Sequence, residues 1–463
     1  MESQDFHLIV LGAGPSGLTV ASALAKLKYR VLIVDFPDKS LKKISKNSEQ
    51  PTQVVDSKFG GNARYWGGQI AYMTIEDLRR FGELSNLSFE QQEMIKQEML
   101  SLSMRLDVPY DSQNSYTHLF SEKALLTFPN VYSTYVGNLD ISNYLNISEH
   151  VAGGFITFLE AEIETLDFQN GRCTSIRLSN HGMLEVSTNG AVCISLGTLN
   201  STILIQRSLD IQRDIRFDVV LDHPHGYIAA FSRSRKSKFY RSPTLRQGKH
   251  IFKRKFKIES FSSQNQGIVE FHYDYLGNFF PEILDFRMRQ KVLFKQYLNK
   301  AFRKLFKRNL FSPEVYWAWL QIEQESRREE GSKLRSSHPF KMELRLDSQD
   351  LDDIVCMQSQ LINEMRKKGF RLLWEASPEF ILSNFQCAFH PCSTLPMSTN
   401  DSDSLVEPFG KIRGTPNLFM ASSASWSVSS WVNPTFMIMT FAKLVSDEIL
   451  SFLDQQFSGG NSN

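Results

Sequence analysis

The first forty residues contain the feature that most constrains the fold. An apolar run, Phe6–Leu11, leads directly into the glycine-rich turn Gly12–Gly17, and an apolar stretch with helical spacing follows. A second apolar run then ends at Asp35. Strand, glycine turn, helix and strand in this order predict a parallel β-α-β unit, the core of a Rossmann-like α/β domain.

The glycines of this turn have the spacing of a dinucleotide-binding motif. Gly12 permits the tight turn, Gly14 lets backbone N–H groups approach a pyrophosphate, and Gly17 lets the helix lie close to the strand. Pro15 suits the first turn of a helix, whose N-terminus favours a phosphate. Asp35 follows about twenty residues later, where a carboxylate binds a ribose hydroxyl. We therefore predict a dinucleotide site, which this motif alone does not assign to FAD or to NAD.

Length and composition predict a globular protein of two domains. A chain of 463 residues is too long for one core, and its 41% hydrophobic and 22% charged residues are typical of a soluble protein. No apolar stretch is long enough to span a membrane, and a strand that starts by residue 6 leaves no room for a signal peptide. The 5 cysteines are odd in number and scattered, so we expect reduced thiols, a cytoplasmic location and no metal site.

Residues 59–69 form a second glycine-rich segment. Two glycine pairs, Gly60-Gly61 and Gly67-Gly68, bracket the aromatic pair Tyr65-Trp66. Glycines let the backbone come close to a flat or charged group, and a mobile loop rarely carries such an aromatic pair at its centre. We expect this segment to line a ligand.

The next part of the chain predicts further elements of the first domain. A capping box at Ser88 and Gln91 predicts a helix to about residue 106. From residue 155, two alternating runs joined by Asn170-Gly171 predict a β-hairpin, and a buried strand at 191–197 follows. We assign residues 1–222 to the dinucleotide-binding domain, with a helical excursion at about 80–150.

A change in composition after residue 222 marks a second domain. The segments 233–257 and 287–308 are rich in Lys and Arg and contain no acidic residue. A strand at 340–346 and an amphipathic helix at 350–368 are expected further on. We assign 223–385 to an inserted α+β domain, after which 386–463 returns to the first domain.

The basic helix expected at 287–308 has two interpretations. It is either an ordinary helix with a solvated basic face, or an interfacial helix that makes peripheral membrane contact with anionic lipid or meets a phosphate-bearing substrate. Nucleic-acid binding is disfavoured, because no known reading module accompanies the basic stretches.

The remaining motifs lie near the C-terminus. His390 begins the pattern H-x-x-x-T-x-x-M, the segment GTPNLFMASS ends in Ser422-Ser423, and Asn433-Pro434-Thr435 opens a final helix. Together with GAGPSG, GGNARYWGG and LDHPHG, these motifs resemble the glucose–methanol–choline (GMC) oxidoreductases, flavoproteins that oxidise alcohols and sugars. The resemblance is nearest to bacterial sugar and polyol dehydrogenases and pyranose oxidases.

The resemblance implies an FAD-binding domain with an inserted substrate domain, and hydride transfer from a CH–OH group to the flavin. His390 and Asn433 hold the positions that lie over the flavin N5 in the family. A neutral imidazole at His390 would take the hydroxyl proton as general base, and the amide of Asn433 would orient the same oxygen. His223 and His225 match a structural turn of the family. The residues implied in FAD binding are Gly12, Gly14, Pro15, Ser16, Gly17, Asp35, Gly60, Gly61, Asn62, Tyr65, Trp66, Gly67, Ser422, Ser423, Asn433, Pro434 and Thr435.

Several positions depart from the family pattern. Pro396 replaces a common arginine, Ser393 a common glycine, and Ser422 stands where many members have an acid. Tyr65 stands where some relatives bond a histidine covalently to FAD, so we expect FAD to be bound non-covalently. We expect an FAD-dependent dehydrogenase acting on a sugar, polyol or other alcohol. The alternatives are an oxygen-using oxidase of the same fold and a flavin-binding subunit without turnover, and the electron acceptor is left open.

Overall fold

The computed structural model describes most of the chain. The residues described are 6–35, 69–71, 88–105, 130–135, 141, 145–179, 181–209, 220–232, 244–247, 250–263, 265–273, 286–306, 314–324, 333–335, 341–343, 346–386, 388, 390–399, 404–431 and 434–458.

A parallel sheet of five strands forms the core of one end of the molecule. Its order is β18-β9-β1-β2-β5, and every neighbouring pair is parallel. Its central strands are buried on both faces, which explains their continuous apolar runs. The strands are β1 (Leu8–Leu11), β2 (Val31–Asp35), β5 (Ile156–Glu160), β9 (Ala191–Ile194) and β18 (Leu418–Met420).

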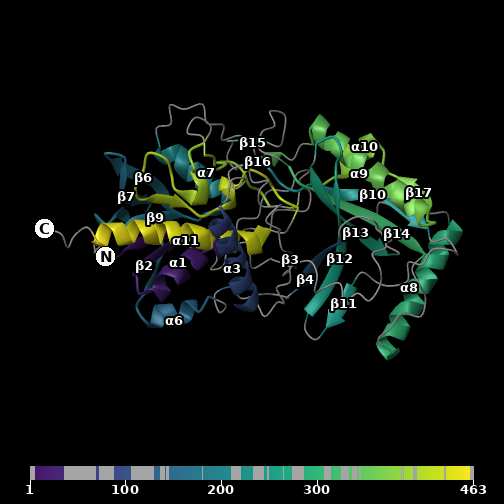
Figure 1. The fold of residues 1–463 in the computed structure, drawn as a ribbon, viewed down its shortest axis with the longest axis horizontal. Coiled ribbons are helices and arrows are strands. Elements are labelled where there is room, and N and C mark those ends of the chain that lie inside the picture. Colours follow the sequence, from purple (N-terminus) through teal and green to yellow (C-terminus); the bar gives the residue numbers. More distant parts are fainter. Residues whose placement is uncertain are drawn as a thin grey trace.

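Helices from both ends of the chain cover this sheet. α1 (Pro15–Lys26) connects β1 to β2, and it packs against the long C-terminal helix α11 (Pro434–Ser458) (Figure 1). α7 (Gly197–Ser208) follows β9, and α6 (Ile147–Ala152) precedes β5. The predicted Rossmann-like α/β class is confirmed.

A small antiparallel sheet adjoins the parallel one. It contains β6 (Ile163–Gln169), β7 (Arg172–Leu178) and β8 (Gly182–Glu185). Asn170 and Gly171 both have positive φ, at 51° and 76°, as a type I′ hairpin turn requires. The run expected as one strand before this turn is divided, because β5 pairs in the parallel sheet and β6 pairs only with β7.

Asn417, which follows Gly414-Thr415-Pro416 in the C-terminal motif, has a structural role. Its side-chain oxygen accepts from the backbone nitrogen of Cys173 at 3.0 Å, and its side-chain nitrogen donates to the carbonyl oxygen of Cys173 at 2.9 Å. The turn before β18 is thereby attached to β7, far away in the sequence.

An antiparallel sheet of eight strands forms the other end of the molecule. The path runs β17-β10-β14-β13-β12-β4-β3, and β11 pairs with β12. β3 and β4 come from the chain before residue 222, so this sheet is not built from the inserted segment alone. The strands are β3 (Gln69–Ala71), β4 (Asn130–Tyr135), β10 (His225–Ser232), β11 (Thr244–Gln247), β12 (His250–Glu259), β13 (Gln266–Tyr273), β14 (Val315–Ile322) and β17 (Arg371–Glu375).

One face of this sheet is covered by α9 (Ser348–Lys367). Ile354, Met357 and Leu361 of α9 belong to one apolar core with Phe271 and Leu320 of the sheet. Asp347 begins the helix with a capping box, in which its side chain accepts from the backbone nitrogen of Asp350 at 2.7 Å. The predicted box at Ser88 likewise begins α3 (Phe89–Arg105).

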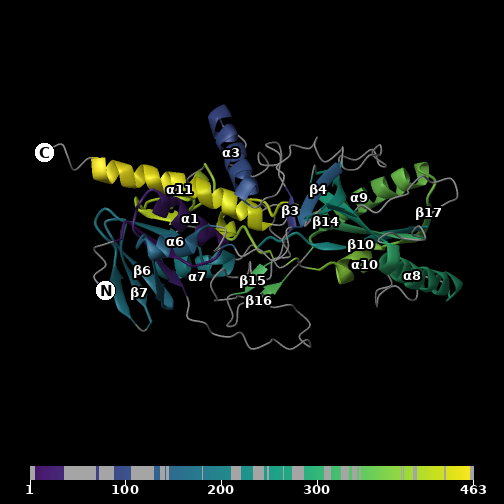
Figure 2. The same ribbon diagram turned by 90° about the horizontal axis from the view of Figure 1, so that it is seen from below.

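The remaining elements are short, apart from α8 (Phe286–Phe306). α10 is Pro378–Asn384, β15 is Lys333–Arg335, and β16, at Lys341–Glu343, occupies part of the strand expected at 340–346. Figures 1 and 2 show an elongated molecule in which the two termini lie at the parallel-sheet end and α8 lies at the opposite end. No helix in the described ranges has both the length and the apolar character needed to cross a membrane.

Candidate active site

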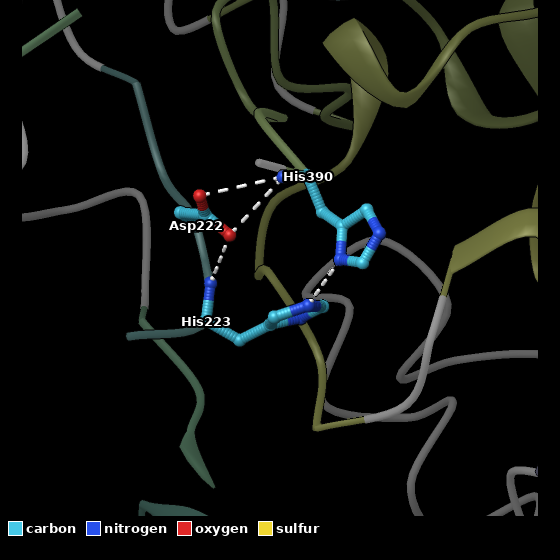
Figure 3. Close-up of side chains that lie close together, drawn as sticks. All are labelled: Asp222, His223 and His390. Atoms are coloured by element: carbon cyan, nitrogen blue, oxygen red, sulfur yellow. Dashed lines mark hydrogen bonds between the residues drawn. The ribbon is translucent and has the colours of Figure 1, made fainter. Parts of the chain in front are cut away.

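Two segments cross between the sheets and bring the candidate catalytic residues together. Leu221 and Cys392 exchange both backbone hydrogen bonds, at 3.0 and 2.9 Å, in a short antiparallel bridge. His225 and Gln386 form a second such bridge, also at 3.0 and 2.9 Å. This crossing places Asp222, His223 and His390 side by side (Figure 3).

Asp222 holds both segments through its carboxylate, which is fully buried. One oxygen accepts from the backbone nitrogen of His223 at 2.7 Å, and both oxygens lie 3.4 Å from the backbone nitrogen of His390. The backbone nitrogen of Asp222 in turn donates to the side chain of Gln324 at 3.2 Å. The carboxylate thereby fixes the backbone positions of both histidines.

The two imidazoles are joined directly. His223 Nε2 and His390 Nδ1 lie 2.6 Å apart, and the rings meet edge to face. Burial lowers the pKa of His390 to about 4, helped by the charge of nearby His225. Burial also lowers the pKa of His223 well below 6.5, and the charge of His390 lowers it further. Both rings are therefore neutral near pH 7.

The eight-stranded sheet carries polar residues on the side opposite α9, and one of them, His225, lies near enough to act on both rings. We use "polar wall" for His225, Tyr227, Lys255, Glu270, His272 and Trp319, which alternate with the apolar residues under α9. Lys255 and Glu270 form a buried ion pair at 3.2 Å, and His272 is stacked on Trp319 with ring centroids 6.1 Å apart. The wall thus combines charged, hydrogen-bonding and aromatic groups.

The end of β14 and the residues after it are hydrogen-bonded to the segment that precedes Asn433. The side-chain nitrogen of Gln321 donates to the carbonyl oxygen of Trp431 at 2.9 Å. The backbone nitrogen of Ser429 donates to the carbonyl oxygen of Gln324 at 2.9 Å. Residues 429–431 are therefore held between the two sheets.

The glycine turn is closely packed at Gly12 and open at Gly14. Gly12 has a φ of +107°, and a Cβ there would lie 2.5 Å from the carbonyl oxygen of Ser195. By contrast, a Cβ at Gly14 would meet nothing within 4 Å, so space is available in front of the turn. Gly14 begins α1 without a side-chain cap, which leaves backbone N–H groups of the first turn directed at this space.

Asp35 lies beside the same turn. The backbone nitrogen of Gly12 donates to the carbonyl oxygen of Val34 at 2.8 Å, which places the end of β2 next to the start of the turn. The Ser16 hydroxyl donates to the carbonyl oxygen of Ala421, so the C-terminal segment meets the N-terminus of α1.

Ser422 and Ser423 lie where this C-terminal segment leaves the sheet. The Ser422 hydroxyl accepts from the backbone nitrogen of Ala424 at 3.2 Å. The Ser423 hydroxyl bonds that of Thr198 at 2.9 Å and donates to the carbonyl oxygen of Pro391 at 3.3 Å. Ser423 thus connects the parallel-sheet end to the residue that follows His390.

Several expected site residues lie outside the described part of the chain, namely Gly60, Gly61, Asn62, Tyr65, Trp66, Gly67 and Asn433. The residues that flank Asn433 are described. Trp431 is buried, and Pro434 and Thr435 begin α11 as buried residues.

His223 is the residue whose position the sequence interpretation did not anticipate. The interpretation gave it a structural role in the LDHPHG turn, whereas the structure places its ring against His390. The sequence signal that could have indicated its role is Asp222, an acidic residue directly before His223 in a buried segment. Asp222, His223 and His390 also present potential metal ligands within 4.8 Å of one another. A metal ion bound through both rings at this contact would have to displace the hydrogen bond between them.

Residues 347–442 match the sequence model of the GMC oxidoreductase family. This range contains His390, Ser422, Ser423 and Asn433, and over it the match bears out the resemblance that the motifs indicate. Among curated proteins, no sequence matches the chain.

Two solved structures share the fold over nearly the whole chain. Pyridoxine 4-oxidase from Mesorbium loti matches with a TM-score of 0.60 and 11% identity, over 96% of this chain and 99% of its own. An FAD-dependent oxidoreductase from Chaetomium thermophilum matches with a TM-score of 0.57 and 11% identity, over 98% of this chain and 100% of its own. At this identity the likeness concerns the fold.

Proposed function

We propose that this chain, a GMC oxidoreductase by its C-terminal segment and its fold, is an FAD-dependent enzyme that oxidises a CH–OH group with His390 as general base. The observation that carries the proposal is the pair of neutral, hydrogen-bonded histidines, His223 and His390, next to His225 of the polar wall. FAD, when bound, supplies the hydride acceptor.

The residues of the N-terminal unit fit the ADP half of such a cofactor. The uncapped helix N-terminus at Gly14 would hold the pyrophosphate, and Asp35 would bind the ribose. Non-covalent attachment is supported by Tyr65, since that position is a bonded histidine in some relatives.

The hydrogen bond between the histidines prepares His390 for its role. Backbone carbonyls of Ser430 and Ser429 interact with His223 and favour a proton on its ring. Nε2 of His223 faces His390, whereas its buried Nδ1 makes no hydrogen bond that meets the distance and angle criteria. We propose that Nδ1 of His223 carries the proton, which leaves Nε2 as the acceptor. His390 Nδ1–H is then the donor, and His390 Nε2 keeps the lone pair that takes the substrate's hydroxyl proton.

The polar wall suits two kinds of alcohol. Its ion pair, imidazoles and phenol could bind several hydroxyl groups, which favours a sugar or polyol. Its stacked His272 and Trp319 favour a flat aromatic alcohol, and pyridoxine 4-oxidase is named for an aromatic substrate.

The four cysteines within the described ranges are free thiols, which supports a reducing, cytoplasmic location.

Anaerobic flavin reduction tests the proposal. The purified protein, mixed without oxygen with a panel of polyols, aldoses and aromatic alcohols, should lose its flavin absorbance with at least one class. A matched sample with His390→Ala should keep its flavin and react much more slowly. A protein that binds FAD but is bleached by none of the panel would favour the flavin-binding subunit without turnover. Oxygen consumption during turnover would separate an oxidase from a dehydrogenase.

A further inference from the structure

α8 presents an apolar surface away from the rest of the protein. Its inner side packs Val292 with Ala230, Val315 and Trp317 of the eight-stranded sheet. Its outer side lies at the end of the molecule farthest from the termini (Figures 1 and 2). The helix has 21 residues, so this outer side is several turns long.

Large apolar side chains gather on that outer side. Phe286, Phe294, Tyr297 and Leu305 are 75%, 62%, 73% and 74% exposed. Six of the 14 exposed large hydrophobic side chains in the described ranges belong to α8, and the others are spread over the remaining elements. An accumulation of this kind marks an interaction surface, whereas single exposed apolar residues do not.

The spacing places most of these side chains in one strip. At about 100° per residue, Phe286, Leu293, Phe294, Tyr297 and Leu305 fall within a sector roughly 120° wide. Val292 lies outside this sector, on the side that packs against the sheet. We call these five residues the apolar strip of α8.

The same sector also contains Arg287, Gln290 and Lys304. Arg287 and Lys304 lie near the two ends of the helix, where long cationic side chains reach the headgroups while their stems stay on the apolar surface.

Other basic residues border the apolar strip along its length. The helix contains seven Lys and Arg residues and no Asp or Glu. Exposed Arg289 and Lys300 lie along one edge of the strip, and exposed Lys291 lies along the other, where it also pairs with Glu314 at 3.5 Å. This is the pattern of a helix that lies in the membrane interface, with its apolar face inserted and its cations at the headgroups.

We propose that α8 docks the protein on an anionic lipid surface, with the apolar strip inserted between the headgroups. Charge decides against a second copy of this chain as the partner. A two-fold symmetric contact through the apolar strip would bring two α8 helices together, each rich in Lys and Arg and without acidic residues. Like charges disfavour such a contact. An anionic bilayer instead complements both the charge and the apolar strip. The docked protein would keep its parallel-sheet end, with both termini, away from the membrane.

Vesicle co-sedimentation of the full-length protein tests this proposal. Phosphatidylcholine vesicles containing phosphatidylserine should retain the protein, vesicles of phosphatidylcholine alone should not, and high salt should release it. The double variant R289E/K300E should weaken retention by about tenfold or more. The double variant F294S/Y297S should weaken it as well, although it leaves every charge in place. Equal recovery with both vesicle types, unchanged by salt, would overturn the proposal.

Two controls separate this outcome from general effects. R366E/K367E makes the same charge change on the exposed end of α9 and should leave vesicle binding within about twofold of the unaltered protein. Flavin content and the thermal unfolding midpoint of each variant report whether it has folded. If the α8 variants instead convert a dimer to a monomer in sedimentation velocity while the parent binds no vesicles, the strip is a contact between copies. These measurements do not depend on the reaction, so they can fail or succeed independently of the proposed function.

Discussion

His223 Nε2 lies 2.6 Å from His390 Nδ1, although the two residues are 167 positions apart in the sequence. The contact occupies one nitrogen of each ring, so the proton that the two rings share determines which nitrogen of His390 is available to a substrate. Asp222 supports the arrangement by accepting from the backbone of both residues.

We expect His390→Ala to retain FAD, because the glycine turn and Asp35 belong to other elements. Anaerobic flavin reduction by substrate should slow by about 10² to 10⁴, the usual contribution of a positioned general base. Asn433→Ala should slow it less, and the double variant should lose less than the product of the two effects, since both act on one oxygen. Reduction of the His390→Ala protein at the original rate would place the base elsewhere.

Substitution of His223 should separate positioning from chemistry. His223→Leu removes the acceptor for His390 Nδ1–H and should slow flavin reduction by roughly three- to tenfold, the effect of one lost hydrogen bond. His223→Gln supplies a side-chain oxygen and should recover part of this loss. Stopped-flow reduction with saturating substrate measures both. Equal rates for the two variants would show that the contact does not govern His390.

The rate of flavin reduction should fall on the acid side. Protonated imidazole cannot accept a proton, and the pKa of His390 is lowered to about 4. The limiting rate should therefore be constant from about pH 7 down to about pH 5 and decline as the pH approaches 4. A rate that rises on acidification would contradict a neutral His390 as the base.

Stability should depend on pH in a window set by the same groups. An unfolded histidine titrates near 6.5, whereas burial lowers the pKa values of His225 and His390 to about 4 in the folded protein. As the pH falls from about 6.5 to about 4, the unfolded chain binds protons that the folded chain does not, so the free energy of unfolding decreases. Urea midpoints at pH 7 and pH 5 measure the change, and His390→Gln should reduce it.

Two alanine substitutions in the glycine turn form a matched pair. Gly12→Ala should prevent folding or lower the urea midpoint strongly, because its Cβ would overlap the carbonyl oxygen of Ser195 at a positive φ. The added Cβ of Gly14→Ala would have no protein atom within 4 Å, so the urea midpoint of unfolding should be unchanged. The same methyl group would enter the space proposed for the pyrophosphate. FAD affinity, measured by fluorescence titration, should therefore fall for a folded Gly14→Ala protein. Unchanged affinity would contradict the placement of the pyrophosphate.

Local signals in the sequence identified the elements that depend on neighbouring residues. The glycine turn, the Asn170-Gly171 hairpin and the Ser88 capping box each need only a few adjacent residues, and all three are present as predicted. Pairing between distant segments could not be predicted in the same way. β5 joins β2 rather than extending the hairpin, since a parallel partner is chosen by the packing of the whole sheet. His223 meets His390 because of a bridge between Leu221 and Cys392, which has no local pattern.

The position of β18 in the parallel sheet has a consequence for synthesis of the protein. β18 pairs with β9, yet it follows β9 by roughly 220 residues, which a ribosome takes roughly 10 to 45 s to add. Throughout that interval the apolar edge of β9 has no strand beside it, and such an edge can pair with another chain. A message truncated shortly before codon 418 would therefore yield a polypeptide with an open sheet edge, rather than a functional enzyme that merely lacks its last helix.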